Sequence, residues 1–173
     1  HFYGVEKFPP DFSHRSKHPN YLCMDLADVG LTFECGLCVE VIEHLTPTMA
    51  KSLAASLRSV AVPGSLFLFN TGLTSYVRNE DPGYLDPFGR GHITCWSVNA
   101  ARRIFEPYGF LVKPISGKSW AFVIELKGNE YRQEILLENR IWSAEPSNIQ
   151  LLCDPVMGNL MHILATESAR AYL

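Results

Sequence analysis

The sequence predicts an α/β fold with a mostly parallel sheet, a C-terminal antiparallel hairpin strand, and helices on both faces. Short apolar runs rich in aromatic and branched residues alternate with helical patterns, as they do in the βαβ units of parallel sheets. The chain has 173 residues, of which 47% are hydrophobic, so it is long enough to bury a substantial core. We therefore expect a compact α/β unit.

Six apolar segments account for the predicted strands. They are HFYGVE (1–6), YLCM (21–24), FECGLCVE (33–40), SLFLFN (65–70), FLVKP (110–114) and WAFVIELK (120–127). The last two flank a short turn that contains Gly117, which is typical of a hairpin. This pair gives the predicted antiparallel strand.

The clearest helix follows the third strand. Thr46 is a good N-cap with Pro47 at the first helical position, and an apolar stripe then recurs every three or four residues. The stripe consists of Met49, Leu53, Leu57 and Val60.

A second helix begins at Ser97, and Gly109 follows it where a left-handed C-terminal cap is favoured. Further helical patterns cover residues 131–142 and 157–172. The part of the chain from 128 onward could cover the core, form a lid or make a homodimer contact.

Charge and cysteine content restrict the class of protein. A net charge of −3 without a basic cluster disfavours binding to nucleic acid, and no apolar run is long enough for a membrane span. Five cysteines, mostly in strand-like runs, favour reduced buried thiols and a cytoplasmic location. Cys35 and Cys38 would point to opposite faces of a strand, so we expect packing rather than a disulfide or zinc site.

Acidic residues follow three of the predicted strands. Glu6, Asp25 and Glu40 occupy these positions, and Glu43 and His44 come directly after the third. In open α/β sheets, ligands bind outside the carboxyl ends of the strands, so these side chains are candidates for a binding site. Solvated loop acids are the alternative explanation.

Several motifs in order resemble those of class I S-adenosylmethionine-dependent methyltransferases, which have a Rossmann-like fold. They are GVE (4–6), MDLAD (24–28), FECGLCVEVIEHL (33–45), VPGSLFLFN (62–70) and GHITCWSVNAARRIFEPYGF (91–110). The resemblance implies a methyltransferase core over residues 1–127, with 128–173 as a helical extension packed on it.

The resemblance also implies S-adenosylmethionine as the cofactor. Glu6 would accept hydrogen bonds from the ribose hydroxyls, while Asp25 and the backbone at Leu26 would face the adenine. Cys38 and Val39 would line the methionine end. A carboxylate can accept two hydroxyl protons, which suits the role of Glu6.

The chain departs from the family pattern at its start, because the first strand and Gly-rich loop that should precede HFYGVE (1–6) are absent. In the family that strand lies between those that begin near residues 1 and 33. We therefore expect an interrupted sheet and a chain that is a fragment of a longer protein.

Three functions follow as hypotheses. The first is a methyltransferase that acts on a small-molecule acceptor, without a metal, in which Glu40, His44 and His92 are catalytic; imidazole is a suitable base near neutral pH. The second is a metal-dependent RNA 2′-O-methyltransferase of the Hen1 type, whose metal ligands resemble Glu40, Glu43, His44 and His92 in order and spacing. The third is a catalytically inactive, methyltransferase-like interaction domain.

The acceptor itself is not identified by any motif. We expect the segment 71–90, with the aromatic residues Tyr76, Tyr84 and Phe88, to shape its pocket.

Overall fold

The computed structural model describes residues 2–115 and 117–128. The chain divides into two units, His1–Arg132 and Gln133–Leu173, and every described residue belongs to the first. The helical patterns at 131–142 and 157–172, and therefore the predicted extension 128–173, lie outside the described residues apart from residue 128. The domain boundary at 127 stays a prediction.

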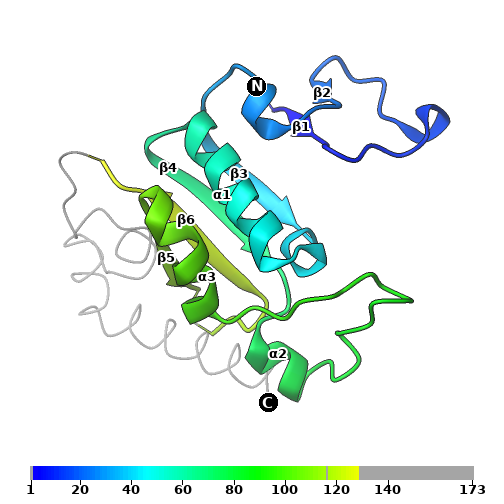
Figure 1. Cartoon of the computed structure of the whole chain (residues 1–173), viewed down its shortest axis with the longest axis vertical. Helices are drawn as coiled ribbons and strands as arrows, with labels where there is room; N and C mark the ends of the chain where they lie inside the picture. The colour runs from blue at the N-terminus through cyan, green and yellow to red at the C-terminus, as the bar shows by residue number, and fades with distance from the viewer. Residues whose placement is uncertain (1, 116, 129–173) are drawn as a thin grey trace, which may run out of the picture. The chain divides into compact units, whose positions relative to one another are not determined.

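A four-stranded sheet forms the centre of the described part (Figure 1). Its order is β3 (Phe33–Val39), β4 (Ala61–Asn70), β6 (Ala121–Leu126) and β5 (Phe110–Pro114). β3 pairs in parallel with β4, whereas β6 is antiparallel to both β4 and β5. Three strands therefore share one direction, and the predicted α/β sheet with an antiparallel hairpin strand is confirmed.

The sheet is interrupted on the N-terminal side of β3. β1 (Gly4–Val5) and β2 (Tyr21–Leu22) pair in parallel with each other in a separate small sheet. Among the described strands, β3 is consequently at the edge of the sheet, and the side chain of Leu37 on it is 75% exposed. The resemblance to methyltransferases predicts this interruption between the strands that begin near residues 1 and 33.

Helix α1 (Pro47–Val60) forms where its capping signals predict. The Thr46 hydroxyl accepts a hydrogen bond from the Met49 N–H at 3.3 Å, which satisfies one of the free donors of the first turn. The predicted apolar stripe is partly wrong, because Met49 is exposed and the small residues Ala50 and Ala54 are buried instead. Their small side chains allow the helix to approach the sheet closely.

Helix α3 (Val98–Phe105) also begins at its predicted cap, where Ser97 accepts from the Ala100 N–H at 3.1 Å. The predicted end is confirmed too, because Gly109 has a left-handed backbone with φ of 87° after the short turn Glu106–Tyr108. The sequence did not indicate helix α2 (Thr74–Asn79).

The core lies between one face of the sheet and helices α1 and α3 (Figure 1). Phe69 of β4 stacks on Phe122 of β6 with ring centroids 4.9 Å apart, and Phe105 of α3 lies 5.0 Å from Phe69. Helices were predicted on both faces. In the described residues, 2–115 and 117–128, α1 and α3 both pack on this same face of the sheet.

The cysteine prediction is only partly correct. The described cysteines are free thiols, and Cys35 and Cys38 lie opposite Leu66 and Phe69, on opposite faces of the strand pair. Cys23 and Cys35 are exposed rather than buried, however. No described helix is long and apolar enough to cross a membrane.

Candidate functional site

The site begins where β3 ends. Glu40 directly follows the strand, and its φ of 51° places a non-glycine residue in the left-handed region. Its N–H still donates to the Asn70 carbonyl of β4, at 3.1 Å. This sharp change of direction leads into the 3₁₀ turn Ile42–His44, which carries Glu43 and His44.

A second segment, far away in sequence, is hydrogen-bonded onto this turn. The N–H groups of Ile93 and Thr94 each donate to the Glu43 carbonyl at 3.0 Å, and the Trp96 indole donates to the Ile42 carbonyl at 2.8 Å. These bonds bring His92 beside His44, so that their ring centroids are 5.0 Å apart. The structure therefore assembles three of the predicted residues from two distant segments.

Both imidazole rings are oriented by backbone carbonyl groups. His44 Nδ1 lies 2.9 Å from the Gly91 oxygen, and His92 Nδ1 lies 2.9 Å from the Tyr84 oxygen. Because a carbonyl can only accept, each Nδ1 must carry the proton and donate. In the neutral rings, Nε2 is then the basic nitrogen of each histidine.

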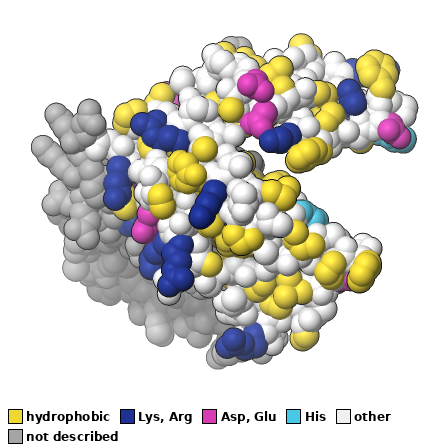
Figure 2. All heavy atoms as spheres, in the orientation of Figure 1, with side chains coloured by type: hydrophobic (Ala, Val, Ile, Leu, Met, Phe, Trp, Pro, Cys, Tyr) yellow, Lys and Arg dark blue, Asp and Glu magenta, His cyan; other side chains and the backbone are white. Residues whose placement is uncertain are grey.

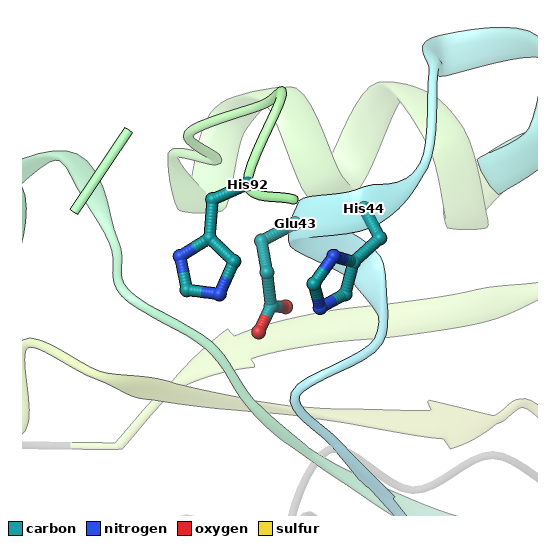
Figure 3. Close-up of side chains that lie close together, drawn as sticks. All are labelled: Glu43, His44 and His92. Carbon is teal, nitrogen blue, oxygen red and sulfur yellow. The ribbon is translucent and has the colours of Figure 1, made fainter. Parts of the chain in front are cut away.

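Glu43 lies between the two rings (Figure 3). Its side chain is 0% exposed, and neither carboxylate oxygen has a hydrogen-bonding partner among the described residues. One ligand atom from each of Glu43, His44 and His92 lies within 4.8 Å of the others. A buried carboxylate without a partner is costly, which makes this cluster a candidate site for a proton, a water molecule or a cation.

Glu40 is electrostatically linked to the cluster. Burial raises the pKa of its carboxyl, the neighbouring Glu43 raises it further, and His44 opposes this shift. Two carboxyl groups this close disfavour a second negative charge, so a proton is retained more readily at Glu40 than in water. Of the predicted residues, Glu43, His44 and His92 thus form one cluster, and Glu40 adjoins it through Glu43 and His44.

The predicted acids at β1 and β2 have a different environment. Glu6 is half-buried and accepts from the Phe8 N–H at 2.9 Å. Asp25 accepts from the Ala27 N–H at 3.0 Å, from Ser56 of α1 at 3.1 Å and from Lys7 at 2.5 Å. The Lys7 ammonium and then the Ala27 N–H lower the pKa of Asp25.

The other predicted cofactor-binding residues are spread over these two regions. Leu26, in the turn after Asp25, packs partly against the core. Cys38 is half-buried, and its pKa is raised to about 12 by burial and by Glu43, so the thiol is protonated. Val39 is the next residue of β3, so its side chain points to the opposite face from Cys38, and it is 53% exposed.

Part of the segment predicted to shape an acceptor pocket lines a pocket, and its role toward an acceptor stays a prediction. Tyr76 and Tyr84 line a pocket of about 430 Å³ that also borders Glu40 and His92. Phe88 is fully exposed and does not line it.

Two structural contributions to the site escaped the sequence analysis. Gly91 has a φ of 73°, and a Cβ there would lie 3.1 Å from His44 Nδ1, so glycine permits the close approach of its carbonyl to that ring. The carbonyl that orients His92 belongs to Tyr84, which was considered only as an aromatic ring. The glycines of the Gly89-Arg90-Gly91 sequence were the signal in the sequence that could have indicated the role of Gly91.

Comparisons with known proteins complete the description. No family model and no curated protein sequence matches the chain. Solved structures with a similar fold include magnesium protoporphyrin IX methyltransferase (ChlM) from Synechocystis PCC 6803 with bound SAH. It has 18% identity and a TM-score of 0.41, and the match covers 62% of this chain and 50% of that one.

Two further similar structures are methyltransferases. N-methyltransferase NodS from Bradyrhizobium japonicum WM9 has 11% identity and a TM-score of 0.39, with 61% of this chain and 58% of that one covered. A SAM-dependent methyltransferase from Methanosarcina mazei has 9% identity and a TM-score of 0.39, with 60% and 66% covered. This chain thus spans about half the length of ChlM.

Proposed function

We propose that the chain forms the core of an S-adenosylmethionine-dependent methyltransferase that acts on a small-molecule acceptor. The observation that carries this proposal is the group Glu40, Glu43, His44 and His92 at the carboxyl end of β3, beside a pocket. In open α/β sheets, this end of the strands is where ligands bind. The ordered methyltransferase-like motifs supply the reaction class.

In the proposed reaction, the acceptor attacks the sulfonium methyl group while a base removes its proton. His92 is the stronger candidate for the base, because it lines the pocket and its Nδ1 is committed to the Tyr84 carbonyl. Its Nε2 is left to accept the proton. Glu43, between the rings, would stabilise the imidazolium that forms, and His44 would share this charge.

The cofactor would lie along the carboxyl ends of β1, β2 and β3. Glu6 has one carboxylate oxygen committed to Phe8 N–H, which leaves acceptor capacity for ribose hydroxyls. Asp25 and the Leu26 backbone would face the adenine, and Cys38 and Val39 the methionine end. A protonated Cys38 thiol would serve there as an apolar contact and not as a nucleophile.

A second candidate is metal-dependent methylation of an RNA ribose. The observation that favours it is the buried Glu43 carboxylate without a partner between two imidazoles. Mn²⁺, Fe²⁺ and Co²⁺ accept a carboxylate and two imidazole nitrogens as ligands. Both histidines donate their Nδ1–H to a backbone carbonyl, which fixes each ring and leaves Nε2 to bind a metal. Glu40 could provide a further oxygen, and such an ion would act as a Lewis acid toward hydroxyl oxygens.

The surface charge favours the small-molecule acceptor over RNA. Figure 2 shows that Lys and Arg side chains on the face of α1 and α3 are interspersed with apolar ones and do not form a continuous basic groove. The chain carries a net charge of −3, whereas RNA binding depends strongly on contacts with phosphates.

Calorimetric titration with S-adenosylhomocysteine tests the proposal. We expect binding that Glu6→Ala weakens by about 1–3 kcal/mol, the cost of leaving polar groups unpaired. Glu34→Ala is the matched control, because Glu34 is exposed at the other end of β3. Equal affinities of the two variants would remove Glu6 from the site.

A further inference from the structure

The pocket beside the catalytic group has a definite chemical character. It measures about 430 Å³, a size suited to a small organic ligand. Its lining includes the aromatic residues Tyr76, Tyr84 and Trp120 and the acidic residues Glu40, Glu80 and Asp81. Aromatic rings and carboxylates dominate this set.

The aromatic wall is held in place by close packing. The Tyr84 hydroxyl accepts from the Gly72 N–H at 2.7 Å, and the ring of Tyr76 lies edge-on to it with centroids 5.8 Å apart. A Cβ on Gly72 would lie only 2.7 Å from the Tyr84 ring, so no larger residue fits there without moving the rings. The third ring, Trp120, is partly exposed at the pocket.

The polar lining is mainly acidic. Glu40, Glu80 and Asp81 contribute three carboxyl groups, against the single guanidinium of Arg90. That guanidinium is paired with Asp81 at 2.5 Å, so the two charges largely neutralise each other. Because the pKa of Glu40 is raised, Glu80 carries the main negative charge of the lining. Glu80 accepts a hydrogen bond from Ser119, which holds it in position.

A cation already lies against one of these rings. The Lys118 ammonium is 5.8 Å from the centroid of the Trp120 ring. Aromatic faces attract cations, and organic ammonium ions are bound by such rings together with carboxylates. A ligand carboxylate, in contrast, would be repelled by the acidic lining.

We propose that this pocket binds a small organic amine in its ammonium form, as the methyl acceptor of the reaction proposed above. The inference rests on that proposed function only for the transfer step, since the binding itself requires no cofactor. The ammonium group lies beside the Glu80 carboxylate, with the acidic groups of Glu40 and Asp81 on the same lining, and the organic part lies against Tyr76 and Trp120.

Methyl transfer to an amine requires its lone pair. The ammonium first loses one proton to His92 Nε2, which borders the same pocket. The nitrogen lone pair then forms the N–C bond to the methyl group while the S–C bond breaks, and the electron pair of that bond returns to sulfur. The products are the methylated ammonium and S-adenosylhomocysteine, and the proton on His92 Nε2 is then released to solvent.

A charge series of similar probes tests the binding. Phenethylamine, 2-phenylethanol and 3-phenylpropionate carry the same ring on a short chain, with a positive, neutral and negative group. We expect calorimetric titration of the whole chain to give an affinity for the amine about tenfold higher than for the alcohol, with the carboxylate weakest. An equal or reversed order would overturn the proposal.

Two pocket variants make opposite predictions. Glu80→Gln keeps the acceptor for Ser119 but removes a charge, so amine affinity should fall about threefold. Arg90→Gln releases the Asp81 carboxylate from its pair, so amine affinity should rise about threefold. Glu34→Gln, a charge removal at the distant end of β3, should leave it unchanged.

Weaker amine binding by Arg90→Gln, in a variant whose thermal unfolding is unchanged, would assign the pocket to an anionic ligand instead. If Arg90→Gln does not fold, the Glu80→Gln comparison still decides. Repeating the titrations with S-adenosylhomocysteine separates the two proposals. Amine binding without cofactor binding would contradict only the proposed function, and cofactor binding without charge preference would contradict only this inference.

Discussion

The carboxyl end of β3 and the carboxyl ends of β1 and β2 both carry acidic residues, but these acids have opposite surroundings. Glu43 is fully buried, and neither of its oxygens has a partner among the described residues. Asp25 is less buried and has three donors, from a lysine, a serine and a backbone N–H. Two regions with the same sequence signature therefore differ in how far their polar groups are satisfied.

This difference separates two uses of a carboxylate. Asp25 joins the turn after β2 to helix α1 through Ser56, so most of its acceptor capacity serves the local structure. Glu43 accepts no hydrogen bond from a donor among the described residues, and its carboxylate faces two imidazoles and the neighbouring Glu40. Unsatisfied buried groups are costly to keep, which makes the β3 end the better candidate for chemistry.

The largest expected effect is at the β3 end. His92→Asn keeps a donor for the Tyr84 carbonyl but removes Nε2, so we expect methyl transfer to an amine to fall by about 10²-fold or more. The wild-type chain should keep its activity in excess EDTA. Transfer of a labelled methyl group measures both, with Glu34→Gln as the control.

Loss of activity in EDTA and its recovery with Mn²⁺ would contradict this prediction and favour the metal-dependent candidate. In that case the chain alone should bind Mn²⁺, measured by electron paramagnetic resonance. His92→Asn and Glu43→Gln should then weaken this binding to a similar extent, since each would remove a ligand.

A smaller effect is expected at the β2 end, and on stability. Asp25→Ala should lower the free energy of unfolding by about 1 kcal/mol at pH 7, because it removes the cap of the turn Leu26–Asp28. Lys7 and the Ala27 N–H lower the pKa of Asp25 in the folded chain, so its contribution is complete above the unfolded pKa near 4. It is lost as the pH falls through the lower folded value.

Urea unfolding of wild type and Asp25→Ala at pH 7 and at pH 2 measures this difference. The charge-dependent part should be absent at the lower pH, and Asp28→Ala, an exposed acid in the same turn, is the control. A difference that does not depend on pH would show that the charge of Asp25 contributes nothing.

The smallest expected effect is a difference in the free energy of unfolding between two variants of Glu40. Glycine adopts the left-handed backbone of this residue without steric cost, so Glu40→Gly should be about 0.5 kcal/mol more stable than Glu40→Ala. Both variants remove the carboxyl whose pKa is raised, so their difference isolates backbone strain. Equal urea midpoints would show that the turn relaxes when the carboxyl is lost.

Local signals in the sequence predicted the elements that depend on near neighbours. Residues a few positions apart are enough to predict these elements, which are the helix caps at Thr46 and Ser97, the left-handed Gly109, and the hairpin of β5 and β6. These local signals did not predict which face of α1 is buried. Ala50 and Ala54 are buried because small side chains fit the narrow space between the helix and the sheet, and the sequence pattern does not show that space.

The sequence by itself determined which residue types could form the site: acids after three strands, and two histidines. Only the tertiary structure decided that Glu43, His44 and His92 meet, since this depends on hydrogen bonds from Ile93, Thr94 and Trp96 to the turn after β3. It also decided which acids are satisfied. Long-range packing sets both properties, because burial and donors for a side chain come from segments that no local pattern connects.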